Sequence, residues 1–136
     1  MPAQDLPPPL YLTVPWPPSF NRIWKPYRKR IVLAKRAHLY KAALRRALPT
    51  GRVAPPLTGR LLVWMNLHPP ASLKEPWDIA NREKLLCDCL TRENVWADDE
   101  QIDGLVMLRC APDKKGRIDI VIHTIAPGGA PITPRL

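Results

Sequence analysis

The sequence predicts an α/β or α+β fold, in which a single domain packs two main helices against a mixed β-sheet. Its 136 residues are enough for one hydrophobic core. Two stretches carry apolar residues at helical spacing, and four short stretches are rich in strand-forming residues. Their order along the chain is β-α-β-α-β-β, which is typical of helices that pack on a sheet.

The first half of the chain contains one predicted strand and one predicted helix. Residues 10–14 form a short apolar run that is stopped by prolines, so we expect the first strand there. Residues 19–31 are expected to form a basic loop. Apolar side chains then recur at helical spacing over residues 33–48, and Pro49 and Gly51 end that helix.

A second strand and a second helix follow. Residues 59–67 carry two alternating sets of side chains, which is the pattern of a strand. Residues 69–77 are expected to be a loop. The second helix is predicted over residues 79–92, with Asp78 as its N-cap. The apolar arc of this helix is expected to face the sheet, although Arg82 intrudes on it.

Two more strands are predicted near the C-terminus. Residues 102–110 and 117–125 are rich in strand-forming side chains. The segment Asp113-Lys114-Lys115-Gly116 has the composition of a turn, so we expect it to connect them. No internal repeat is visible in the sequence.

The ends of the chain differ in composition from the domain between them. Residues 1–9 are rich in proline and residues 126–136 in glycine and proline, so both are predicted to be flexible tails around a domain of residues 10–125. The N-terminus lacks the positive start and apolar run of a signal peptide. The chain has three cysteines, an odd number that fits a reduced, cytoplasmic protein better than a disulfide scaffold.

The charge is unevenly distributed along the chain. The formal net charge is +9, with 21 Lys and Arg against 12 Asp and Glu. No acid stands between Leu6 and Lys74, although that stretch holds many of the basic residues. Such a basic surface usually binds nucleic acid, and the alternative is a solvated face that only aids solubility. The candidate nucleic-acid-binding residues are Asn21, Arg22, Lys25, Arg28, Lys29, Arg30, Lys35 and Arg36.

Many of the acids gather in and around two short segments. These segments are Trp77-Asp78-Ile79-Ala80-Asn81-Arg82-Glu83-Lys84 and Trp96-Ala97-Asp98-Asp99. A basic chain that concentrates its carboxylates is expected to hold a cation there, and a cation beside a polyanion indicates phosphodiester chemistry. In such a site Lys84 would stabilise negative charge that develops during the reaction.

Each of these residues also has a simpler explanation, which stays open at this point. Asp78 alone is explained as a helix N-cap, and Lys84 as the partner of Asp88 one turn further along. The run Asp98-Asp99-Glu100 is explained as a solvated turn. Their coincidence in an otherwise basic chain favours a functional site.

These segments resemble the motifs of RusA-type Holliday-junction resolvases. The resemblance rests on Val14-Pro15-Trp16-Pro17-Pro18-Ser19-Phe20-Asn21-Arg22, on Asp78-x-x-Asn81-x-x-Lys84 and on Trp96-x-Asp98-Asp99. It covers about residues 10–125. It implies a homodimeric endonuclease that depends on Mg²⁺ and nicks four-way DNA junctions symmetrically.

The resemblance also implies roles for single residues. By motif position, Asp78 and Asp99 would bind the metal and Lys84 would be the catalytic lysine. Asn81 and Asp98 match neighbouring motif positions with less defined roles.

One position departs from the family pattern, because Ala80 stands where the family has a third Asp. Mg²⁺ binds through few carboxylates plus waters and substrate oxygens, so this loss should weaken or misplace the ion. Two explanations compete: an engineered Asp-to-Ala change that prevents cleavage, or a natural variant that uses Glu75 or Glu83 instead. We favour the first, because an isolated alanine in an otherwise intact motif is more typical of a designed change than of drift.

The sequence therefore predicts a structure-selective endonuclease that resolves four-way junctions by paired nicks, with cleavage impaired by Ala80. The alternative is a non-catalytic junction-binding or nucleic-acid-binding protein. The expected partners are junction DNA and a second copy of the chain, with Mg²⁺ as cofactor. No membrane or nucleoside triphosphate is expected, because the chain has no run of about 20 apolar residues and no Gly-rich phosphate loop. A cytoplasmic protein of a bacterium or a prophage is expected.

Overall fold

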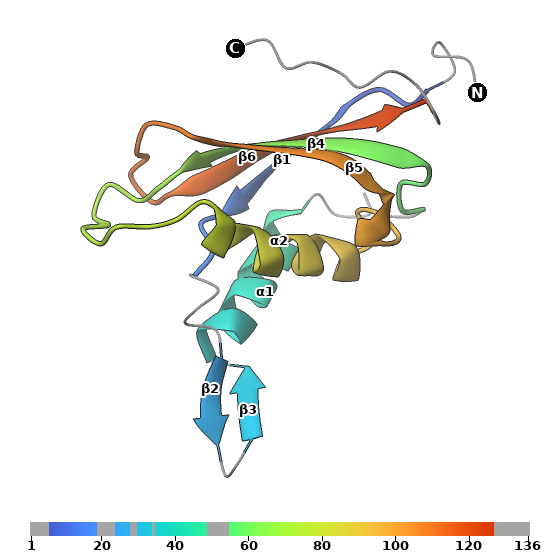
Figure 1. Ribbon diagram of the computed structural model, residues 1–136. Coiled ribbons are helices and arrows are strands. Elements are labelled where there is room, and N and C mark those ends of the chain that lie inside the picture. The colour runs from blue at the N-terminus through green and yellow to red at the C-terminus, as the bar shows by residue number, and fades with distance from the viewer. Residues whose placement is uncertain (1–5, 19–23, 28–29, 34, 49–54, 127–136) are drawn as a thin grey trace.

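A four-stranded mixed β-sheet forms the centre of the computed structural model, which describes residues 6–18, 24–27, 30–33, 35–48 and 55–126 (Figure 1). Its strands are β1 (Leu10–Pro15), β4 (Arg60–His68), β5 (Ile102–Arg109) and β6 (Arg117–Ile125). The strand order across the sheet is β1-β6-β4-β5. β6 is antiparallel to both of its neighbours, whereas β5 is parallel to β4.

One face of the sheet forms the hydrophobic core. Every second residue of β4 is buried, from Leu61 to Leu67, and the same alternation occurs in β6. The register places Met65 of β4 opposite Ile120 of β6, and both side chains are almost completely buried. The period of two in the sequence therefore separates a core face from an open face, as expected of a sheet that is covered on one side.

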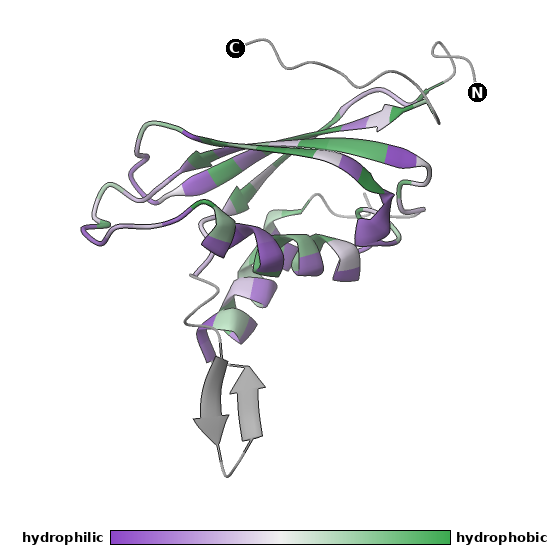
Figure 2. Cartoon of the chain, viewed as in Figure 1, coloured by the Kyte–Doolittle hydropathy of each residue, from purple (hydrophilic) through white to green (hydrophobic). Residues whose placement is uncertain are grey.

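Two helices, α1 (Lys35–Ala47) and α2 (Ala80–Arg92), cover that face of the sheet (Figure 1). The buried residues of α1 include Tyr40 and Leu44, and those of α2 include Leu86 and Leu90. Hydrophilic residues lie on the outer sides of both helices, away from the sheet (Figure 2). The predicted fold class, one domain with a mixed sheet and two main helices, is confirmed.

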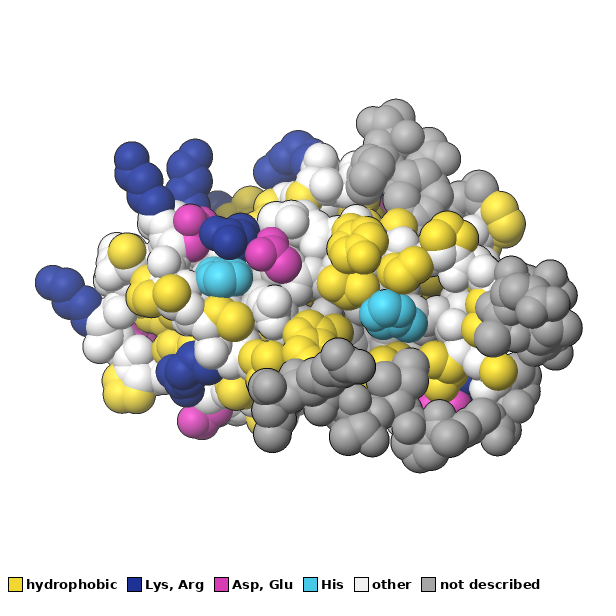
Figure 3. Space-filling view, turned by 90° about the horizontal axis from the view of Figure 1, so that it is seen from above, with side chains coloured by type: hydrophobic (Ala, Val, Ile, Leu, Met, Phe, Trp, Pro, Cys, Tyr) yellow, Lys and Arg dark blue, Asp and Glu magenta, His cyan; other side chains and the backbone are white. Residues whose placement is uncertain are grey.

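Among the described residues, no helix lies on the opposite face of the sheet, which is seen from above in Figure 3. Hydrophobic side chains gather in the middle of this face, beside two histidines. Tyr11 of β1 and Leu108 of β5 belong to it and are exposed.

The expected basic loop over residues 19–31 is wrong for the part of it that the structure describes. Strands β2 (Trp24–Tyr27) and β3 (Arg30–Leu33) pair as an antiparallel ribbon that projects from the body of the protein (Figure 1). Pro26 argued against a strand, because proline cannot donate a ladder hydrogen bond. In a two-stranded ribbon each strand has an open edge, where a missing donor is tolerated. Residue 33 consequently belongs to β3, and the first helix begins at Lys35.

The prediction that Asp78 is the N-cap of α2 is also wrong. The cap position is Ile79, which has a helical backbone conformation and makes no side-chain capping bond. The Asp78 carbonyl accepts a hydrogen bond from the Asn81 amide at 3.2 Å, which tightens the first turn of the helix. The Asp78 carboxylate therefore does not cap the N-terminus of α2.

The predicted turn between the last two strands lies where expected, but it does not join neighbours in the sheet. β6 lies between β1 and β4, and β5 is on the far side of β4. Gly116 has a positive φ of 80°, which glycine adopts without strain. The predicted tails lie largely outside the described residues. In the part of the chain that is described, no helix has the length and apolar character to span a bilayer.

Replacing Gly116 by alanine should destabilise the fold more than the same change at Gly59. Both glycines have positive φ, but a Cβ at position 116 would lie 2.7 Å from Pro70 Cδ, whereas a Cβ at position 59 would meet nothing closer than 3.7 Å. We expect a loss of about 1 kcal/mol for Gly59→Ala and clearly more for Gly116→Ala. Urea unfolding of both variants checks this, and equal losses would contradict it.

Candidate active site

The two acidic segments lie at opposite ends of α2. Asp78 stands just before the helix, and Asp99 belongs to the short 3-10 helix η3 (Asp99–Gln101) that follows it. Asp99 accepts a hydrogen bond from Thr91, which is in the last turn of α2. A helix of 13 residues is about 20 Å long. The two predicted metal ligands therefore do not meet within one chain. Among the described residues, no three His, Cys, Asp or Glu side chains are placed to hold a metal ion.

Asp78 is an exposed carboxylate on a well-fixed backbone. The Asn81 side-chain amide donates to Asp78 Oδ2 at 3.3 Å. The residue before it, Trp77, is held from β5 by Arg109, whose Nη2 donates to the Trp77 carbonyl at 2.8 Å. The Arg109 guanidinium carbon also lies 3.9 Å from the centre of the Trp77 ring, a cation–π contact. These contacts position the Asp78 carboxylate and leave it exposed to a ligand.

Arg82 ties the segment after β1 to the first turns of α2. Only 7% of Arg82 is exposed, and its Nη1 donates to the Pro17 carbonyl at 3.1 Å. Its guanidinium carbon lies 5.3 Å from the centre of the Trp16 ring. Trp16 in turn packs against Trp77 in a T-shaped pair, with ring centres 4.9 Å apart. A buried charge needs such partners, because desolvation alone would cost several kcal/mol.

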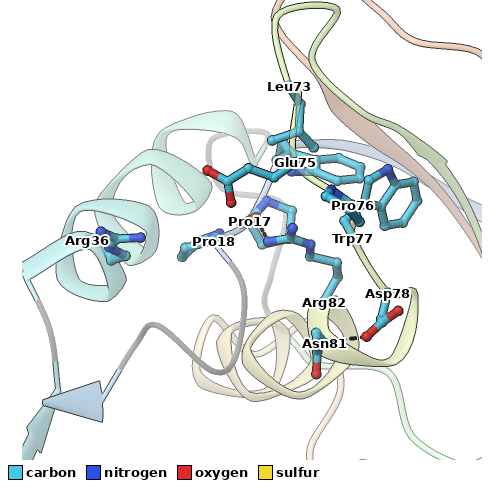
Figure 4. A pocket seen from close by; sticks show the side chains of 11 residues that line it. Pro17, Pro18, Arg36, Leu73, Glu75, Pro76, Trp77, Asp78, Asn81 and Arg82 are labelled. Carbon is cyan, nitrogen blue, oxygen red and sulfur yellow. Dashed lines mark hydrogen bonds between the residues drawn. The ribbon is translucent and has the colours of Figure 1, made fainter.

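A polar cavity of about 360 Å³ opens beside Asp78 (Figure 4). This volume is at the lower end of the range for small-ligand sites. Side chains from α1, from α2, from the segment after β1 and from the loop before α2 surround it (Figure 4). The polar cavity is lined by Trp16, Pro17, Pro18, Arg36, Leu73, Glu75, Pro76, Trp77, Asp78, Asn81 and Arg82.

Lys84 lies one turn along α2 from Asn81 and is exposed. Its Nζ is 3.7 Å from Asp88 Oδ1, so the simpler explanation, an i,i+4 ion pair, is present. Both side chains of this pair are about half exposed. Exposed pairs contribute about 0–1 kcal/mol, so a phosphate can displace Asp88 from Lys84 at little cost.

Asp98 has a structural function in the second acidic segment. It is the N-cap of η3, and its carboxylate accepts from the Glu100 amide at 3.2 Å. The Gln101 side chain accepts from the Asp98 amide at 2.8 Å, which completes a capping box. These bonds give Asp98 a structural role, and its predicted place in the catalytic site stays a prediction.

Asp99 is held differently, by two side-chain donors. The indole N–H of Trp96 donates to Asp99 Oδ1 at 3.0 Å, and the Thr91 hydroxyl donates to the same oxygen. Trp96 is completely buried, so this donor is fixed by the core. The half-buried carboxylate of Asp99 is therefore oriented by α2 and by the core.

Comparison with families of known proteins matches residues 15–123 to the family described as Endodeoxyribonuclease RusA. The chain belongs to the RusA family. The protein named crossover junction endodeoxyribonuclease RusA is 26% identical to it over 111 residues in both Escherichia coli (strain K12) and Shigella sonnei (strain Ss046). That alignment covers 82% of this chain and 91% of each relative. The protein of the same name from Enterobacteria phage 82 is 26% identical over 112 residues, which cover 82% of this chain and 92% of the relative.

Ala80 stands where the resemblance predicts a third Asp, and the structure separates Glu75 from Glu83, the two acids considered as substitutes. Glu75 lines the polar cavity together with Asp78. Glu83 instead lies beside Cys87. Burial raises the pKa of the Cys87 thiol most, and the charge of Glu83 and the hydrogen bond that the thiol donates to it raise that pKa further. The geometry therefore favours Glu75 over Glu83 as a nearby carboxylate.

The residues predicted to bind nucleic acid fall into three groups. Lys35 and Arg36 are exposed in the first turn of α1. Lys25 and Arg30 belong to the ribbon of β2 and β3. The other predicted residues, which lie outside the described part of the chain, are Asn21, Arg22, Arg28 and Lys29.

Sequence reasoning missed the residues that support this RusA-family site. Arg82 was noticed only as a charge inside an apolar arc, and that anomaly is the signal of a buried, partnered arginine. Arg109 and Thr91 carried no local signal, because their contacts reach across the fold or across a helix end.

Proposed function

We propose that this protein is an endodeoxyribonuclease that binds four-way DNA junctions and hydrolyses phosphodiester bonds at the point of strand exchange. The observation that carries the proposal is the placement of Asp78 and Asn81 in the lining of a polar cavity, with Lys84 exposed one turn further along α2, in a chain of the RusA family. The relatives are named crossover junction endodeoxyribonucleases, which supports the same substrate.

The residues around Asp78 have the chemistry that this reaction needs. Asp78 and Asn81 present oxygen atoms, the donors that Mg²⁺ prefers. When bound, Mg²⁺ supplies Lewis-acid stabilisation of charge on the scissile phosphate. Lys84 would bring an ammonium group to the pentacoordinate phosphorus, where negative charge develops. Trp77 and Arg109 keep the backbone of Asp78 in place, so the geometry is set before DNA binds.

The basic surface supports DNA as the substrate. The first turn of α1 has no acid, and Lys35 and Arg36 are exposed there. The last turn of the helix carries Arg45 and Arg46. The ribbon of β2 and β3 extends beyond α1 (Figure 1). Together with the basic residues of that ribbon, this side of the protein would neutralise several backbone phosphates.

The separation of Asp78 from Asp99 supports a homodimer. A four-way junction has approximate twofold symmetry, and a twofold dimer would place one site on each of two opposing strands. If two copies pack with their α2 helices antiparallel, Asp78 of one copy approaches the partner's Asp99. One chain would then hold half of each site, and dimerisation would complete both.

A non-catalytic junction-binding protein is the second candidate, and Ala80 is the observation that favours it. Ala80 is exposed at the start of α2, two residues from Asp78, and the family resemblance predicts a metal-binding Asp at this position. We therefore expect this chain to bind junctions and to cut them slowly or not at all.

Junction DNA should bind tightly and with a steep salt dependence. Neutralising about 6–10 phosphates would lower the affinity by about 10³–10⁵ between roughly 50 and 200 mM salt. Fluorescence anisotropy in Ca²⁺ measures this, with a duplex of the same length as the control. Equal affinity for junction and duplex would contradict the proposed substrate. An affinity that does not change with salt would contradict the electrostatic interface.

Replacing Ala80 by aspartate should restore Mg²⁺-dependent nicking. The change returns a carboxylate beside Asp78, so Mg²⁺ should also bind more tightly by calorimetry without DNA. In the Ala80→Asp background, Lys84→Ala should slow cutting by about 10² or more with little change in junction binding. Ala71→Asp is the matched control, because it adds the same charge at an exposed position outside the polar cavity. Equal cutting by the original chain would make Glu75 the next residue to test.

Mixed dimers distinguish a site within one chain from a site shared between two. In the Ala80→Asp background, Asp78→Asn and Asp99→Asn should each abolish cutting by the homodimer. A co-expressed mixed dimer should regain one nick per junction if the sites are shared, because one of its two sites then has both carboxylates. A gel that separates single from paired nicks reads this out. A mixed dimer without activity would place both carboxylates in one chain's site, and a strict monomer on the junction would exclude the dimer.

A further inference from the structure

Two hollows meet at the segment Trp16-Pro17-Pro18, and their chemistry differs. One is the polar cavity beside Asp78. The other, the apolar shelf, is a shallow surface that runs along α1. The apolar shelf is lined by Pro15, Trp16, Pro17, Pro18, Arg36, Leu39, Tyr40 and Ala43. Trp16, Pro17, Pro18 and Arg36 line both hollows, so a ligand that spans them must pass these four residues.

The polar cavity combines two carboxylates, those of Glu75 and Asp78, with groups that favour a phosphate. Arg36 enters it from α1, and Asn81 and Arg82 enter it from α2 (Figure 4). The first turn of α2 borders the same cavity, and the N-terminus of a helix favours anions. In addition to the helix N-terminus, two guanidinium groups from different helices line the cavity, and guanidinium groups bind phosphate.

The apolar shelf suits a planar base. Leu39 is 59% exposed and lines the shelf together with three prolines, so its apolar surface is continuous with theirs. Beside it, the Tyr40 hydroxyl donates to the Pro15 carbonyl at 2.7 Å, so this polar group is already used within the protein. The shelf therefore offers proline, leucine and aromatic carbon to a ligand, while Arg36 stands at its border with the cavity.

We propose that the polar cavity and the apolar shelf together bind one unpaired nucleotide next to the cut, with its phosphate in the cavity and its base on the shelf. The inference rests on the proposed junction-cutting function. Inside a duplex both faces of a base are stacked, so only a nucleotide at a break in stacking can offer a face to the protein. The point of strand exchange is such a break, and this subsite would position the strand against Asp78.

Abasic substitution in the junction tests the base half of this subsite. A junction is made with single abasic sites at each nucleotide around the exchange point, and binding is measured in Ca²⁺. At one position, loss of the base should weaken binding by at least about fivefold. Leu39→Ala should weaken binding to the intact junction to a similar degree and should be insensitive to that abasic site. Leu108→Ala, the matched control on the open face of the sheet, should behave like the unaltered chain.

Neutral methylphosphonate linkages test the phosphate half. At the same nucleotide, this linkage should weaken binding by the unaltered chain and should have little further effect on Arg36→Gln. Arg46→Gln is the control, because it removes an exposed arginine from the other end of α1. It should lower affinity generally but remain sensitive to the linkage.

The outcomes separate this subsite from the function on which it rests. If junctions bind better than duplex but no abasic position affects binding, the subsite is wrong and the proposed function stands. In another outcome, Leu39→Ala shifts the protein from dimer to monomer in sedimentation but leaves its response to abasic sites unchanged. The shelf is then a contact between copies, and the subsite is wrong. If junction and duplex bind equally, the proposed function fails and the subsite fails with it.

Discussion

The burial of one side of α2 against the sheet determines where every candidate catalytic residue lies. Leu86 and Leu90 are completely buried in the core, and this contact fixes the rotation of the helix about its axis. Asn81 and Lys84 are consequently left on sides that solvent and DNA can reach. The same contact fixes the two helix ends, so the distance from Asp78 to Asp99 follows from the length of α2 and not from the acids themselves.

Arg82 is the exception within the buried side of α2, and it connects parts of the fold that are distant in sequence. Its bond to the Pro17 carbonyl joins residues 65 positions apart. A leucine at this position would fit the apolar side of α2, but it would not donate a hydrogen bond to the segment after β1. The charge therefore costs desolvation and in return gives the wall of the polar cavity a defined position. Rigid walls of this kind allow a site to discriminate between ligands.

The sequence was sufficient for what depends on local periodicity and insufficient for what depends on contacts between distant segments. The alternation in β4 and the apolar arc of α2 predicted both elements and their buried faces. The ribbon of β2 and β3 was missed, because Pro26 signals a loop unless the open edge of a two-stranded ribbon is known. The acids of the site were found by composition, but their separation by α2 was not. Spacing along a chain gives no distance until the element between two residues is assigned and measured.

The ribbon of β2 and β3 has a consequence for how such proteins diversify. It forms a two-stranded sheet of its own and pairs with no strand of the four-stranded sheet. Changes in its length or sequence therefore leave the hydrogen bonds of the central sheet intact. A lineage can alter this appendage as its host or its DNA targets change, while selection on foldability acts elsewhere in the chain. Stability and target choice would then evolve on separate parts of one small protein.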